Sequence, residues 1–214
     1  MRLRTGLSLG AAVLVTLTLS QCAAVPAAPT GVLIAGDSLA AGLFASTRAE
    51  GFRGLLFDEW SVDEKDRLTY GFPHGRLSEI TQAEVPANVR LAVIEIGTND
   101  FGKTPRTEFG RTYSGFLQRL VEKSPDVELY CLGLWRSTVA VHNSATPDDY
   151  DRLIEMACEN VGGTFVPLSP IFDIKNTRGP AGVETETGAS DEFHPNDLGH
   201  RMIADAVLEA IESE

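Results

Sequence analysis

Short apolar runs separated by amphipathic stretches limit most strongly what this chain can fold into. Residues 32–35 and 91–96 are almost wholly apolar, and weaker runs follow at 67–70, 127–134 and 164–168. Apolar side chains recur at helical spacing within residues 48–60, 109–120, 150–157 and 196–211. Strands that are apolar on both faces occur in parallel sheets covered by helices on each side. The pattern therefore predicts an α/β fold with such a sheet at its centre.

Polar side chains capable of catalysis follow these predicted strands. Ser38 comes after the first strand, Asn99 after the strand at 91–96, and Asp191 and His194 stand just before the closing helix. In open parallel sheets the working residues lie beyond the carboxyl ends of the strands. We therefore expect these four side chains to meet at one edge of the sheet.

Three sequence blocks resemble those of the SGNH (GDSL) hydrolases over about residues 31–212. They are Gly36-Asp37-Ser38-Leu39, Gly97-Thr98-Asn99-Asp100 and Asp191-x-x-His194-Pro195. The resemblance implies a three-layer α/β/α sandwich with a flavodoxin-like, five-stranded parallel sheet of order 2-1-3-4-5. A further block of that family is a single glycine, for which this chain offers two candidates. We favour Gly75, and Gly71 is the alternative.

The chemistry of these residue types is that of acyl transfer. A serine hydroxyl needs a base to become a nucleophile, and an imidazole needs a partner that fixes its tautomer. We expect Ser38 as nucleophile, His194 as base and Asp191 as its partner. The oxyanion would be held by the backbone N–H groups of Ser38 and Gly75 and by the Asn99 amide.

Each block alone has a simpler interpretation as a turn or a helix cap, and only their joint occurrence favours catalysis. The chain is then a hydrolase of carboxylic esters, small or borne on a polymer. An acyltransferase that moves an acyl group to a sugar or alcohol is the alternative, and a non-catalytic binding protein is a third. Asp37 and Asp100 are expected to be structural.

The other histidines and aromatic residues near these blocks are less informative. His74 either lines the pocket or lies in a solvated loop, His142 belongs to a surface loop, and His200 packs or caps the closing helix. Trp135 and Phe44 flank the expected pocket, where they stack on a sugar, line an acyl pocket or pack in the core. We expect no cofactor and no metal, because no ligand spacing or phosphate-binding loop is present.

The net charge of −12 argues against nucleic acid and against adhesion to an anionic membrane. At the N-terminus a basic start precedes an apolar run at residues 7–19, which is short for a bilayer span and typical of a secretory signal. We therefore expect an exported protein, with residues 1–27 as signal and linker and 28–214 as one hydrolase domain. Contact with a membrane is expected only through a lipid anchor at Cys22.

The position of the signal cut has two interpretations. Leu19-Ser20-Gln21-Cys22 resembles a lipoprotein box that makes Cys22 the lipidated N-terminus, while Val25-Pro26-Ala27 offers an ordinary cleavage site. Two further cysteines, Cys131 and Cys158, either pair in an oxidising compartment or are two small buried residues. We favour the unpaired interpretation. The sequence specifies no oligomeric state.

Overall fold

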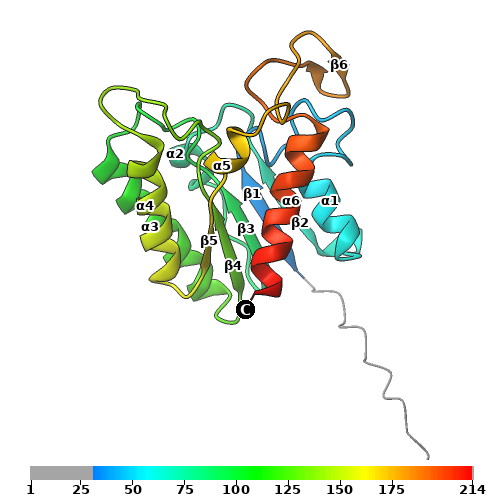
Figure 1. Ribbon diagram of the computed structural model, residues 1–214. Helices are drawn as coiled ribbons and strands as arrows, with labels where there is room; N and C mark the ends of the chain where they lie inside the picture. The colour runs from blue at the N-terminus through cyan, green and yellow to red at the C-terminus, as the bar shows by residue number, and fades with distance from the viewer. Residues whose placement is uncertain (1–30, 214) are drawn as a thin grey trace, which may run out of the picture.

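A five-stranded parallel sheet forms the centre of the computed structural model, which describes residues 31–213. The order is β2-β1-β3-β4-β5, and every neighbouring pair is parallel. This confirms the predicted topology (Figure 1). The predicted signal, Cys22 and both cleavage sites lie outside the described residues. The strands are β1 (Val32–Gly36), β2 (Arg67–Gly71), β3 (Leu91–Glu95), β4 (Glu128–Leu132) and β5 (Thr164–Val166).

Helices cover both faces of this sheet, as Figure 1 shows. One apolar layer joins α1 (Phe52–Glu59) and α6 (Asp197–Glu212) to side chains such as Val32 and Ile34 of β1. The other joins α2 (Leu77–Ile80), α3 (Arg106–Lys123) and α4 (Pro147–Glu159) to side chains such as Leu33 and Ala35. Successive residues of β1 thus point into opposite layers, which explains why the whole strand is apolar.

Helix ends differ from those predicted because an apolar stripe marks only the buried face. The first helix begins at Phe52 rather than at 48, since Gly51 is still extended. α4 begins earlier than its stripe, at Pro147, where Thr146 and Asp149 form a capping box. The sequence did not predict η1 (Glu64–Asp66), α5 (Ser169–Phe172) or the hairpin of β6 (Glu184–Thr185) and β7 (Gly188–Ala189). These pieces are short and carry too few residues for a periodic signal.

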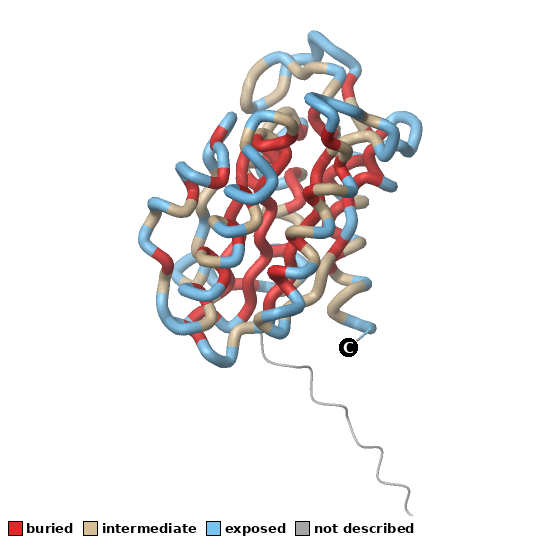
Figure 2. The backbone as a smooth tube through the Cα atoms, turned by 90° about the vertical axis from the view of Figure 1, so that its left-hand side faces the viewer, coloured by how far each residue is buried: buried red, intermediate tan, exposed pale blue. Residues whose placement is uncertain are grey.

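Burial follows the layers of the fold. β1 and β3 are buried along their whole length, whereas β2 lies at an edge and is partly exposed. Figure 2 shows the buried strands passing through the middle of the molecule with exposed loops around them. No helix within residues 31–213 is both long and apolar enough to cross a membrane.

Cys131 and Cys158 form a disulfide that joins β4 to the last turn of α4. Our preference for two unpaired cysteines was therefore wrong. Cys131 points from β4 into the layer that holds α4, and Cys158 lies on the helical face that covers it. Their Cα atoms are 6.1 Å apart, within the range that a disulfide spans. Helical periodicity identified the face of Cys158, but it could not show which strand that face meets.

Candidate functional site

The first element of the site is the loop that leaves the carboxyl end of β1. Its Asp37 N–H donates to the backbone oxygen of Glu95 at 3.2 Å, so the loop begins as a continuation of the β1–β3 pairing. Asp37 Oδ1 accepts a hydrogen bond from the Leu39 N–H at 3.2 Å and lies 3.3 Å from Ser38 Oγ. Ser38 itself is almost fully buried. The loop therefore holds the serine hydroxyl in one place above the strand.

Ser38, His194 and Asp191 lie in a hydrogen-bonded chain. His194 Nε2 is 3.0 Å from Ser38 Oγ, and His194 Nδ1 is 2.7 Å from Asp191 Oδ2. The other oxygen, Asp191 Oδ1, accepts from the backbone N–H groups of Phe193 at 2.8 Å and His194 at 2.7 Å. Partial burial opposes ionisation, but these hydrogen bonds prevail and lower the pKa of Asp191. An ionised Asp191 requires the His194 proton on Nδ1, which leaves Nε2 free to accept from Ser38.

The chain around His194 keeps its imidazole outside the closing helix. Asn196 is the N-cap of α6, and its Oδ1 accepts from the Gly199 N–H at 3.1 Å. His194 thus lies in the loop before the helix, as Pro195 predicted. The Phe44 ring packs edge-on against the His194 ring at 5.0 Å. Phe44 is half-buried and also borders a cavity of about 340 Å³, whose lining residues do not include His194.

Asn99 lies on the other side of the Ser38 loop. Its Nδ2 donates to Asp37 Oδ2 and to the Gly75 carbonyl, each at 3.1 Å. Gly75 is therefore the glycine next to Asn99, whereas Gly71 lies within β2, paired with Gly36. The Gly75 N–H donates to the Phe72 carbonyl at 2.7 Å. Two of the three groups expected to hold an oxyanion, the Asn99 amide and the Gly75 N–H, thus donate to protein oxygens.

The two aspartates expected to be structural hold neighbouring loops. Asp37 links Ser38 to Asn99 through the contacts above. Asp100 Oδ2 accepts from the Leu77 N–H at 2.9 Å, which ties the segment after Gly75 to the Asn99 loop. Burial raises the pKa of Asp100. Both carboxyls act on the site through the loops that they connect.

Glu95 is a buried carboxyl beneath the site that the sequence prediction missed. Its Oε2 accepts from the Asp37 and Ala40 N–H groups, each at 3.3 Å, while Oε1 has no hydrogen-bond partner among residues 31–213. Burial and the adjacent Asp37 carboxylate raise the pKa of Glu95 well above its usual range. Burial also raises the pKa of Asp37 to about 6. The only sequence signal was one carboxylate inside an otherwise apolar strand.

Trp135 and Arg136, which follow β4, connect the loops that carry Asn99 and His194. The Trp135 N–H donates to Thr98 Oγ1 at 3.0 Å, and the Trp135 indole N–H donates to the Phe193 carbonyl at 2.8 Å. Arg136 Nη2 donates to the Thr98 carbonyl at 3.2 Å. Trp135 is fully buried, so of its three expected roles the structure favours core packing.

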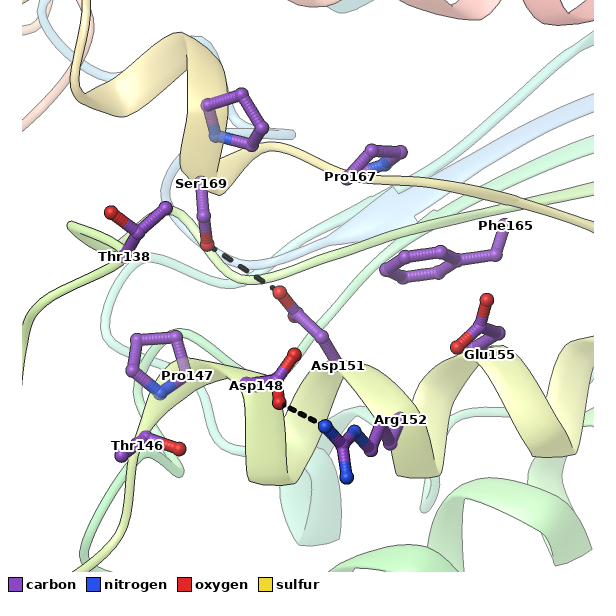
Figure 3. Close-up of a pocket in the computed structure, with 11 residues that line it drawn as sticks. Thr138, Thr146, Pro147, Asp148, Asp151, Arg152, Glu155, Phe165, Pro167 and Ser169 are labelled. Carbon is purple, nitrogen blue, oxygen red and sulfur yellow. Dashed lines mark hydrogen bonds and ion pairs between the residues drawn. The ribbon is translucent and has the colours of Figure 1, made fainter.

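A separate groove lies between α4 and the segment after β5 (Figure 3). Its volume is about 630 Å³, and none of the expected site residues lines it. Asp151, on α4, accepts from the Leu134 N–H at 2.8 Å and from the Ser169 hydroxyl at 3.4 Å. Figure 3 shows the Asp151 side chain reaching from the helix towards Ser169. This carboxylate anchors the loop that continues to Trp135 and Arg136.

The remaining histidines lie away from the Ser38 hydroxyl. His200 is fully buried, where its Nδ1 accepts from the Phe52 N–H at 3.3 Å. Burial lowers the pKa of His200 to about 4, so it stays neutral and packs α6 against α1. His74 and His142 are exposed loop residues. Within residues 31–213 no cluster of three or more His, Cys, Asp or Glu side chains has the arrangement of a metal site.

The sequence identifies the family to which this fold and arrangement belong. Residues 34–202 match the family model of the GDSL-like lipase/acylhydrolase family. The match covers most of the chain, which therefore belongs to this family and is an ester-bond hydrolase by class. No curated protein matches the chain.

Solved structures of similar fold include esterases, lipases and a transferase. A carbohydrate esterase family 2 enzyme from Corynascus thermopiles is 17% identical, with a TM-score of 0.67, over 88% of this chain and 68% of that one. Phospholipase A1 from Streptomyces albidoflavus is 14% identical, with a TM-score of 0.61, over 86% and 100%. A salicylyl-acyltransferase from a tetracycline biosynthetic pathway is 18% identical, with a TM-score of 0.59, over 86% and 55%. At these identities the likeness extends to the fold alone.

The contacts of His194 and His200 predict opposite effects of their substitution. His194→Ala removes the group 3.0 Å from Ser38 Oγ, so we expect turnover to be nearly abolished with a small change in melting temperature. His200→Ala leaves a buried cavity and an unpaired Phe52 N–H, so we expect a lower melting temperature and less than about tenfold loss of activity. Ester turnover and thermal unfolding, measured on the same preparations, separate the two. An inactive His200→Ala beside an active His194→Ala would contradict the arrangement.

Glu95 predicts a pH dependence of stability. Its pKa in the folded protein lies above the ordinary value of 4.5, so the stability linked to its protonated form is fully present below that pH. That stability is lost as the pH rises towards the folded pKa. Glu95→Gln keeps the shape and does not titrate, so its melting temperature should fall less than that of the wild type between about pH 5 and pH 8. If the melting temperatures of the wild type and of Glu95→Gln fall equally across this range, Glu95 is not held protonated in the folded protein.

Proposed function

We propose that this protein is an exported hydrolase of carboxylic esters that forms an acyl-enzyme on Ser38. The observation that carries the proposal is the chain from Asp191 through His194 to the Ser38 hydroxyl, with contacts of 2.7 and 3.0 Å. A base within hydrogen-bond reach of a serine hydroxyl is what nucleophilic attack requires. The family supports the reaction class, and the geometry supports these residues.

In the first half of the reaction Ser38 Oγ attacks the ester carbonyl carbon while its proton passes to His194 Nε2. The resulting imidazolium is stabilised by the Asp191 carboxylate. Collapse of the tetrahedral intermediate breaks the bond to the alcohol oxygen, which takes the proton from His194. Water then attacks the acyl-enzyme by the same route and releases the acid and the free serine.

The oxyanion would be held by the Ser38 and Gly75 N–H groups and by Asn99 Nδ2. Asn99 uses both amide hydrogens on protein oxygens, so a bound oxyanion would take the place of one of them. The Gly75 carbonyl is the weaker acceptor, since a hydrogen bond to a charged oxygen is roughly twice as strong as one to a neutral oxygen. Gly75 would likewise exchange its bond with the Phe72 carbonyl for one with substrate.

Export is supported by the N-terminal signal pattern and by the Cys131–Cys158 disulfide, since disulfides persist in oxidising compartments. Acyl transfer to an alcohol acceptor is the second candidate function. The similarity of this fold to that of a salicylyl-acyltransferase supports acyl transfer as a candidate, because the same nucleophile and base would serve both reactions. Incubating the enzyme with an ester and excess glycerol, and quantifying free acid against new glyceryl ester, distinguishes them.

Ser38→Ala tests the proposed nucleophile. We expect turnover of p-nitrophenyl acetate or butyrate to fall on the order of a million-fold, because the covalent step is lost. The melting temperature should change little, since the hydroxyl makes few contacts. Release of p-nitrophenol above the uncatalysed rate is the measurement. Retention of a tenth of wild-type activity would remove Ser38 from the mechanism.

Asn99→Ala tests the oxyanion donor. If the amide stabilises the oxyanion, turnover should fall roughly a hundred- to a thousand-fold with little change in KM. A residue that only shapes the loop would instead lower the melting temperature and leave the specific activity of the folded protein intact. Kinetics and thermal unfolding of one preparation decide between these results.

A further inference from the structure

Arg136 places a cation next to the proposed catalytic groups. Its Nη2 donates to the carbonyl of Thr98, the residue before Asn99. Its guanidinium carbon lies 4.4 Å from the ring centroid of Phe193, the residue before His194, and 5.6 Å from that of Phe101. The guanidinium therefore lies between the Asn99 loop and the His194 loop.

This cation forms no ion pair with a carboxylate within residues 31–213, although the chain carries 30 acidic and 18 basic residues. Burial lowers the pKa of the Arg136 guanidinium, and the Asp37 carboxylate, which is not in contact with it, opposes this shift without reversing it. A partly buried charge with no carboxylate in contact gains from a ligand that supplies one. Elsewhere five arginines form ion pairs with carboxylates: Arg48, Arg90, Arg106, Arg152 and Arg201.

The free donors of Arg136 are the two terminal nitrogens. Nε is sealed from solvent and has no partner. Nη1 makes no hydrogen bond and is not sealed, and Nη2 keeps one hydrogen besides the one given to Thr98. An anion can thus be bound end-on by one hydrogen from each Nη. The guanidinium carbon lies over the Phe193 and Phe101 rings, and a charge pair formed beside such apolar groups is stronger than one in water.

We infer that Arg136 binds an anionic group, a carboxylate or a phosphate, carried by the ester substrate. This inference rests on the proposed function of the Ser38 site and makes Arg136 a residue that determines specificity. A purely structural role is the alternative, since Arg136 connects two loops. Trp135 already joins the same two loops by two hydrogen bonds, so the charge of Arg136 is not needed for that purpose.

The test compares esters that differ by one anionic group. One pair is p-nitrophenyl butyrate and p-nitrophenyl hemisuccinate, and the other is a monoacylglycerol and its phosphate, so the pairs distinguish carboxylate from phosphate. For at least one pair, Arg136→Gln should lower the ratio of kcat/KM for the anionic ester to that for the neutral ester by about tenfold or more. Arg136→Lys, which keeps the charge without the planar fork, should give an intermediate ratio.

Arg178→Gln is the matched control. Arg178 also lies over a phenylalanine ring, at 4.0 Å from the centroid of Phe172, and also has a buried Nε without a partner. It contacts the Glu192 carbonyl rather than the Asn99 loop. The ratio should stay at its wild-type value in this variant. An equal shift in Arg178→Gln would indicate the general field of the protein and would overturn the assignment of a contact to Arg136.

A uniform loss of activity on both members of each pair in Arg136→Gln, with an unchanged ratio, would also overturn the inference and leave a structural role. If no ester is turned over by the wild type, the proposed function fails and the inference is tested by binding. Calorimetric titration with glutarate and with inorganic phosphate should then show binding that Arg136→Gln and Arg136→Lys weaken to different extents. No binding, or equal binding by wild type and both variants, would count against it.

Discussion

The parallel pairing of β1 with β3 decides where the Ser38 loop and the Asn99 loop leave the sheet. Gly36 stands opposite Glu95 in that register, so the chain segments that follow, with Ser38 and Asn99, leave the sheet side by side. The approach is close enough that a Cβ on Gly36 would lie 2.2 Å from the Glu95 carbonyl oxygen. Glycine is therefore required at this position by the close approach of the Glu95 backbone. The serine loop and the asparagine loop are positioned by one backbone interaction.

Much of this arrangement is visible in the sequence because it is local or periodic. Apolar runs predicted the five strands, helical spacing predicted the four long helices, and the rule that function gathers at carboxyl ends of parallel strands predicted that Ser38 and Asn99 meet. Asp191 and His194 are three residues apart, so their contact is also local. The family resemblance called for an oxyanion glycine, and the preference for Gly75 over Gly71 came from its place after Pro73 at the start of a possible helix.

The groups that the sequence did not reveal depend on contacts between distant segments. Glu95 looks like an exception within an apolar strand, and its hydrogen bonds to the Asp37 and Ala40 N–H groups arise only from the register of β1 and β3. Arg136 lies on a loop after β4, and its neighbours come from two other loops. The disulfide joins β4 to α4, and periodicity alone cannot show how that helix is rotated relative to the strand. Partners of this kind follow from packing.

The chain enters the sheet at the amino end of β1, and Figure 1 shows this point and the end of α6 at the opposite side of the molecule from the loops that carry the site. A group held at the amino end of β1 would therefore lie across the sheet from Ser38 and His194 and would leave the approach to the proposed site open.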